Sequence, residues 1–177
     1  MVETGRPLLQ DVFSYTREGA AWINHSWLSQ MILYGLHQLA GYAGLSYWVV
    51  GLSILSMALL FFQMSGSAGW RALLLILAAA ASAPVWSPRP QLTSLVLLAL
   101  LGWLIQHWRA GNLRRLWVLP LIFCLWSNLH GGFSLGFLLL LAFFGGQVLD
   151  HLPGFSGEAM PWKDLGRIAL WSGLAAL

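Results

Sequence analysis

Long apolar stretches alternate with short polar breaks along most of the 177-residue chain. Residues 44–64 and 91–107 contain no Asp, Glu, Lys or Arg. The first stretch reaches and the second approaches the roughly 20 residues that a helix needs to cross a bilayer. Residues 71–86, 116–126 and 133–149 are further apolar stretches. Because backbone groups in lipid must be hydrogen-bonded internally, these stretches are predicted to be helices.

The polar breaks predict where these helices end. Residues 87–90, with the sequence Ser-Pro-Arg-Pro, are predicted to form a turn, because two prolines so close together cannot lie inside a helix. Residues 109–115 form a basic loop, and residues 127–132 interrupt the apolar pattern again. Residues 150–163 are a polar loop, after which another helix is predicted to begin at Asp164.

The first part of the chain is more polar than the rest. Residues 1–24 contain several charged side chains and are predicted to be loop. Residues 27–39 are apolar but too short to span a bilayer, and Ser26 before them is a suitable helix N-cap. We therefore predict an interfacial helix for residues 27–39.

The composition favours a membrane location. Hydrophobic residues make up 58% of the chain and charged residues only 8%, whereas a soluble domain carries about 25% charged residues. The eleven Trp also fit a membrane protein, since Trp concentrates at membrane–water interfaces. We predict an all-α, polytopic transmembrane helix bundle with about five spans plus one interfacial helix. It is expected to be a single domain (1–177), in which 1–43 is an extracytoplasmic loop with the interfacial helix and 44–177 are the transmembrane helices.

The basic residues predict an orientation for the helices. Six of them fall in alternate breaks, which places them on one side: Arg71, Arg109, Arg114, Arg115, Lys163 and Arg167. Lys and Arg accumulate in short cytoplasmic loops, so this side is predicted to face the cytoplasm in a multi-pass protein of a bacterial inner membrane. The expected partner is membrane lipid. Basic residues this few and dispersed do not indicate nucleic-acid binding.

Three polar segments fall at the predicted extracytoplasmic end. They contain the candidate site residues Asp11, His25, Arg89, Gln91, Asn128 and His130. Polar side chains at membrane depth are costly, so their clustering favours a site or a water-filled cavity. The planar guanidinium of Arg89 suits phosphate, and we predict substrate binding by Arg89 and the three candidates after it. Asp11 and His25 are the candidates for catalysis, as general base or metal contact, with the metal itself unknown.

Each of these candidates has a purely structural alternative. Asp11 and His25 fit equally well as solvated loop residues. Arg89 fits equally well as a turn residue whose charge reaches the lipid headgroups. Asn128 and His130 are more often found hydrogen-bonding between helices than in catalysis.

Residues 11–16 with 22–28, 89–92 and 126–132 together resemble segments of bacterial multi-spanning proteins related to the C-type glycosyltransferase superfamily. The resemblance implies transfer of a sugar from a polyprenyl-phosphate carrier at the extracytoplasmic face. It further implies that a carboxylate in the first outer loop, here Asp11, acts as base or binds a divalent metal, while basic residues hold the phosphate. The family's first transmembrane helix and its earlier Asp- and Trp-containing motif have no counterpart in this sequence, so we expect a partial chain.

The alternative is a non-catalytic membrane subunit that packs against partner helices. Gly132 and Gly136 lie four residues apart, a spacing more typical of close helix packing than of a binding site. In a cofactor-bearing complex, a histidine such as His130 would ligate a haem or chlorophyll. A transporter is less favoured, because no predicted span contains a buried acidic residue of the kind that couples ion movement.

Overall fold

The computed structural model describes residues 10–22, 24, 26–153 and 157–176. Over these residues the chain folds into α-helices and one short 3-10 helix: α1 (Trp27–Gln63), α2 (Ala68–Ser82), η1 (Ala83–Val85), α3 (Gln91–Arg109), α4 (Val118–Leu129), α5 (Phe133–Asp150) and α6 (Trp162–Leu174). The only β pairing among the described residues is an isolated bridge between Gln10 and Ala21. The predicted all-α class is confirmed.

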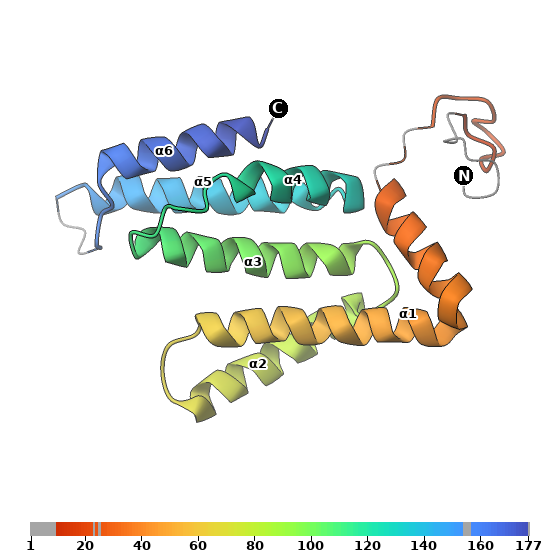
Figure 1. The fold of residues 1–177 in the computed structure, drawn as a ribbon, viewed down its shortest axis with the longest axis horizontal. Coiled ribbons are helices and arrows are strands. Elements are labelled where there is room, and N and C mark those ends of the chain that lie inside the picture. The colour runs from red at the N-terminus through yellow and green to blue at the C-terminus, as the bar shows by residue number, and fades with distance from the viewer. Residues whose placement is uncertain (1–9, 23, 25, 154–156, 177) are drawn as a thin grey trace.

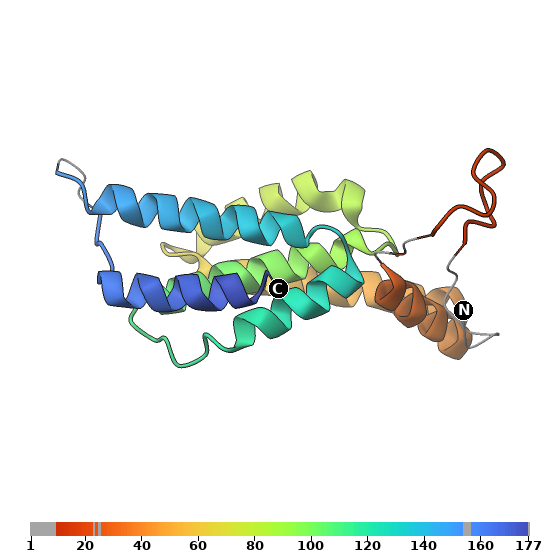
Figure 2. The ribbon, with the colours of Figure 1, turned by 90° about the horizontal axis from the view of Figure 1, so that it is seen from above.

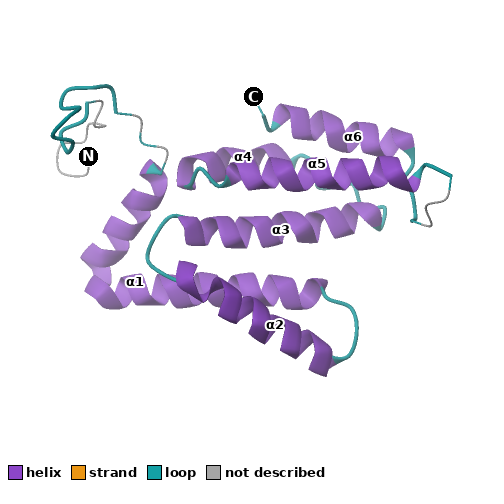
Figure 3. Cartoon of the chain, turned by 180° about the vertical axis from the view of Figure 1, so that it is seen from behind, coloured by secondary structure: helices purple, strands orange, loops and turns teal. Residues whose placement is uncertain are grey.

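The helices run back and forth along one common direction (Figure 1). Helix α3 lies between two layers, with α1 and α2 on one side and α4, α5 and α6 on the other, and the view from behind shows the same order (Figure 3). The turns therefore alternate between two ends of the bundle. We call the end with the η1–α3 and α4–α5 turns the His130 end, and the end with the α3–α4 and α5–α6 loops the Arg109 end.

Helix α1 consists of two arms that meet at a kink. Ala40 has φ −143° and Gly41 has φ 56°, ψ −144°, so neither residue is helical. Glycine suits this position because side chains disfavour positive φ. The predicted boundary between a helix at 27–39 and a following span is thereby confirmed, and the first arm (residues 27–39) leaves the second (residues 42–63) at a steep angle (Figure 1).

The apolar core lies between α3 and α4, with contributions from α5 and α6. Trp108 of α3 and Trp126 and Phe123 of α4 are the largest fully buried side chains. Leu165 and Ile168 bring α6 onto the same core. The second arm of α1 joins α3 through Gln63, whose Nε2 donates to the carbonyl oxygen of Ala99 at 2.9 Å. These contacts hold α3 between α1 and α4.

The number of possible spans differs from the prediction. Four helical segments are long and apolar enough to cross a membrane: Trp27–Gln63, Ala68–Val85, Gln91–Arg109 and Phe133–Asp150. The stretch predicted as a span at 116–126 forms instead the 12-residue helix α4. At 1.5 Å per residue this helix is about 18 Å long, against a hydrocarbon core of about 30 Å. The described residues thus supply four helical segments of spanning length, and the count of about five spans stays a prediction.

The loops divide the basic residues as the charge pattern predicts. Arg71 lies in the first turn of α2, and Arg109 lies in the last turn of α3. Arg114 and Arg115 follow in the α3–α4 loop, while Lys163 and Arg167 lie in α6 near its start. All six belong to the Arg109 end, whereas Arg89 lies in the η1–α3 turn at the His130 end.

Candidate functional site at the His130 end

His130 stands at the centre of a hydrogen-bonded chain that joins α3, α4 and α5. It follows the last residue of α4 in an extended conformation, which ends the helix. Its Nδ1 lies 2.8 Å from the Oγ of Ser94, and the backbone N–H of Gly132 donates to the same Nδ1 at 3.0 Å. The indole Nε1 of Trp126 donates to the Oγ of Ser94 at 2.8 Å.

These contacts decide which nitrogen of His130 holds the proton. The Ser94 oxygen accepts the indole hydrogen, and its own hydrogen is free to point at Nδ1. Since Gly132 also donates to Nδ1, this nitrogen is the acceptor, and the neutral ring has its hydrogen on Nε2. Burial lowers the pKa of His130 below its usual value of 6.5, because the charged form is poorly solvated there. Among the described residues Nε2 has no hydrogen-bond partner.

Gly132 and Gly136 allow this arrangement. A Cβ on Gly132 would stand 2.5 Å from the Ser94 Oγ and 2.7 Å from the His130 Nδ1. A Cβ on Gly136 would stand 2.8 Å from ring carbons of both Phe123 and Trp126. These distances are too short for atoms that are not bonded to each other. Gly132 and Gly136 therefore serve the close packing of α5 against α3 and α4, as their spacing predicts.

Asn128 connects the first arm of α1 to α4. Its Oδ1 accepts a hydrogen bond from the indole Nε1 of Trp27 at 2.7 Å, and its Nδ2 donates to the Cys124 carbonyl oxygen at 2.8 Å. Next to it, the Ser29 hydroxyl donates to the Leu129 carbonyl oxygen at 2.7 Å, which satisfies one of the free carbonyls at the helix end. Asn128 thus has the structural role of an interhelical hydrogen bond, which is the alternative favoured by the sequence.

Arg89 and Gln91 lie at the same end as His130. Arg89 is exposed in the turn that precedes α3, and Gln91 is the half-buried first residue of α3. Gln91 precedes Ser94 by three residues, a rise of about 4.5 Å along the helix. The side chains of Arg89 and Gln91 make no hydrogen bond or ion pair with the described part of the chain. They therefore remain available to a ligand.

Asp11 is not brought to this cluster. Its Oδ1 accepts hydrogen bonds from the backbone N–H groups of Phe13 and Ser14, both at 2.9 Å. Its backbone pairs with Gly19 and Ala20, which closes a small loop around a side chain only 5% exposed. Figures 1 and 2 show this loop beyond the start of α1, away from α3, α4 and α5.

The predicted clustering of Asp11 with Arg89, Asn128 and His130 stays a prediction, and among the described residues the Asp11 carboxylate is hydrogen-bonded within its own loop. A hydrogen bond from the Ser14 side chain, followed by the Phe13 backbone bond, lowers the pKa of Asp11, so the group is a stabilised carboxylate and a poor base. The other catalytic candidate, His25, lies outside the described residues. No three His, Cys, Asp or Glu side chains among the described residues come together as a metal site.

Ser94, Trp126 and Ser29 are the site residues that sequence reasoning did not single out. Ser94 is a buried polar residue within an apolar helix. A polar residue in an apolar stretch can be seen in the sequence, and it indicates a polar partner on another helix. The partner of Ser94 is 36 residues away along the chain and that of Ser29 is 100 residues away, so no local pattern reveals either pair.

The fold and the site together define an all-helical protein with four helices long and apolar enough to cross a membrane and a hydrogen-bonded polar cluster at one end. Comparison with protein families, with curated proteins and with solved structures finds no match to this chain. The glycosyltransferase resemblance thus rests on the sequence segments alone.

Proposed function

We propose that this chain is a multi-pass integral membrane protein of a bacterial cytoplasmic membrane. Its support is the apolar surface of the long helices. Helix α2 has no buried residue although it is almost entirely apolar, and Ile76 on it is 66% exposed. Large apolar side chains are also exposed on α1 and α5, for example Phe62 (75%) and Leu141 (68%). A water-soluble monomer rarely exposes apolar surface on this scale, whereas lipid covers it without cost.

A topology experiment tests this membrane location. Cys124 is the only cysteine, so Cys124→Ser provides a background without thiols. Single cysteines are then placed at Ser87 in the η1–α3 turn and at Gly111 in the α3–α4 loop. In intact cells, a membrane-impermeant maleimide is expected to label position 87 and not position 111. Labelling of both, or release of the protein by alkaline carbonate, would contradict the proposal.

We further propose that the His130 end binds the phosphate of a lipid-linked sugar, as part of a glycosyltransferase-like unit. One observation supports this role: the hydrogen-bonded chain fixes His130 with Nε2–H as a donor, at the same end as the exposed guanidinium of Arg89. A neutral N–H donor and a guanidinium together complement a phosphate. Because Asp11 is hydrogen-bonded within its own loop, the role proposed for this chain is substrate binding and not proton abstraction.

Binding of polyprenyl phosphate to the purified protein tests this role. Hydrogen bonds to charged groups contribute about 1.5–3 kcal/mol, so Arg89→Ala and His130→Ala should each weaken binding by roughly 10- to 100-fold. Arg167→Ala is the matched control, since Arg167 is an exposed arginine at the opposite end and should leave binding unchanged. Equal affinities for the wild type and the two site variants would refute the assignment.

The second candidate function is a non-catalytic subunit, which the unburied helix α2 favours. A stable complex on co-purification would support it. Ligation of a haem or chlorophyll by His130 is not favoured, because Nδ1 accepts from Gly132 and the ligating nitrogen would have to be the protonated Nε2. We therefore expect the absorption spectrum of the purified protein to show no Soret band and no Q-band.

A further inference from the structure

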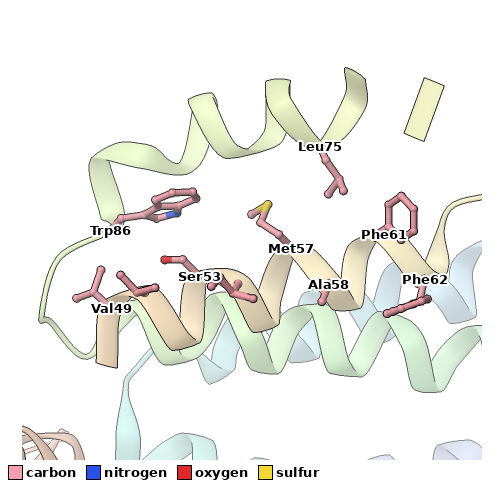
Figure 4. Close-up of a pocket in the computed structure, with 10 residues that line it drawn as sticks. Val49, Ser53, Met57, Ala58, Phe61, Phe62, Leu75 and Trp86 are labelled. Atoms are coloured by element: carbon pink, nitrogen blue, oxygen red, sulfur yellow. The ribbon is translucent and has the colours of Figure 1, made fainter. Parts of the chain in front are cut away.

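A second candidate site lies on the opposite side of the bundle, between α1 and α2. The two helices diverge and leave a groove of about 510 Å³, within the usual range for small-molecule sites. Its walls are apolar along almost their whole length, and Figure 4 shows side chains from α1, from α2 and from the residue after η1 around one space. The residues that matter below are Ser53, Met57, Ala58, Phe61, Leu75 and Trp86.

Two polar atoms in the groove lack partners. The Oγ of Ser53 and the indole Nε1 of Trp86 are both buried and make no hydrogen bond to any described residue. Ser53 is only 5% exposed. Figure 4 shows the two side chains, from opposite walls, facing the same space. Buried polar groups are nearly always satisfied, so a pair of unsatisfied ones in a single groove indicates a ligand with an acceptor oxygen between them.

The groove is lined mainly by apolar side chains, and a charged residue follows its mouth in the chain. Toward the His130 end it continues past Trp86 to Tyr42 and Pro88, and the next residue is the exposed Arg89. Toward the Arg109 end it is lined by Phe61 and Leu75. A ligand that fits therefore has an anionic group at one end, an acceptor oxygen next to it and a hydrocarbon chain beyond.

We propose that this groove binds one acyl chain of an anionic, ester-linked phospholipid. The ester carbonyl accepts hydrogen bonds from Trp86 Nε1 and Ser53 Oγ, the phosphate lies at Arg89, and the chain extends along Met57 toward Phe61. A polyprenyl chain has no oxygen at the level of Ser53, so it would leave both donors unsatisfied. The inference rests on the proposed membrane location but not on the proposed role of His130.

Native mass spectrometry of the detergent-purified protein tests the carbonyl contacts. The probes are dioleoyl phosphatidylglycerol and its dialkyl ether analogue, which lacks only the two carbonyl oxygens. The ester lipid is expected to bind about 25-fold more tightly, since it accepts two hydrogen bonds and each net hydrogen bond contributes roughly a factor of five. Ser53→Ala and Trp86→Phe should each reduce this preference, and the double variant should abolish it. Ser127→Ala and Trp117→Phe, which alter a serine and a tryptophan outside the groove, should retain it.

Ala58→Phe and His130→Ala, together with Ser53→Ala, keep the proposal falsifiable and separate it from the function proposed for His130. Ala58→Phe fills the groove and should weaken both lipids equally. Ser53→Ala removes an unsatisfied buried hydroxyl and should raise the Tm of lipid-free protein, which shows that the variant is folded. His130→Ala should leave the ester preference unchanged, and Ser53→Ala should leave polyprenyl-phosphate binding unchanged. Equal affinity of the wild type for ester and ether lipids would overturn the inference.

Discussion

Helices α3 and α2 are both apolar and both of spanning length when α2 is taken with η1, yet the protein uses them differently. Ten residues of α3 are buried, and the polar ones among them include Thr93 and Ser94. In α2 no residue is buried, and the only polar side chain near its end, Ser82, hydrogen-bonds to its own helix. The difference teaches that hydrophobicity marks which stretches become helices and does not by itself tell a packed helix from an exposed one.

The largest expected effect comes from one substitution made in both helices. Leu101→Ala in α3 removes a fully buried side chain and should lower the free energy of unfolding by about 2–5 kcal/mol. Leu77→Ala in α2 removes a side chain that is 57% exposed and should change it by less than about 0.5 kcal/mol. Denaturation in detergent micelles measures both. A large loss for Leu77→Ala would show that another surface covers α2.

Glycine positions give the next contrast. Gly136→Ala places a methyl group against Phe123 and Trp126 and should destabilise the protein by about 1–3 kcal/mol. Gly69→Ala in the first turn of α2 meets no atom within 4 Å. It should be neutral or stabilising by up to about 1 kcal/mol, because alanine favours the helix. The same denaturation assay applies, and equal effects at the two positions would contradict the packing described for α5.

Serine substitutions sharpen the comparison at the site. Ser94→Ala leaves the buried Trp126 indole without its acceptor and should cost about 1–3 kcal/mol. Ser82→Ala removes a hydroxyl that bonds only to Ala78 and Ala79 of its own helix, and its effect should lie near zero. Nitrogen NMR of labelled His130 adds a direct readout. The wild-type ring should have its proton on Nε2, and Ser94→Ala should leave it there, because the backbone N–H of Gly132 still donates to Nδ1.

The smallest effect is a dependence of stability on pH. The pKa of folded His130 lies below the unfolded value of 6.5. Between these two values the unfolded chain binds the proton and the folded protein does not, so stability is complete above about pH 6.5 and falls as the pH is lowered through the folded pKa. Protonation of Nδ1 also removes the acceptor that Ser94 and Gly132 use. His130→Gln should reduce this slope, and an unchanged slope would assign it to another group.

The sequence predicts most of the fold because the apolar stretches and their breaks are local signals. Composition within a few residues predicts the separate helix at residues 27–39, the turn at Pro88 and Pro90 and the alternation of the basic loops. The start of α4 does not, because Leu116 and Trp117 are apolar like the residues after them and yet form turns.

The candidate site is less predictable for the same physical reason. The end of the bundle that holds Arg89, Gln91, Asn128 and His130 follows from the order of the helices. The hydrogen bonds that decide their roles join residues far apart in the chain, and no local pattern reports them. Asp11 differs, because its partners are local: its carboxylate accepts hydrogen bonds from the N–H groups two and three residues later. A turn motif of this kind competes with any distant partner.

The first arm of α1 has a consequence for how the protein is made. Trp27 and Ser29 are bonded to residues 101 and 100 positions later in the chain. At the roughly 5–20 residues per second of protein synthesis, these partners emerge about 5–20 s after the arm. During that interval these two hydrogen bonds cannot form. Assembly of the His130 end is therefore a late event in the synthesis of the chain.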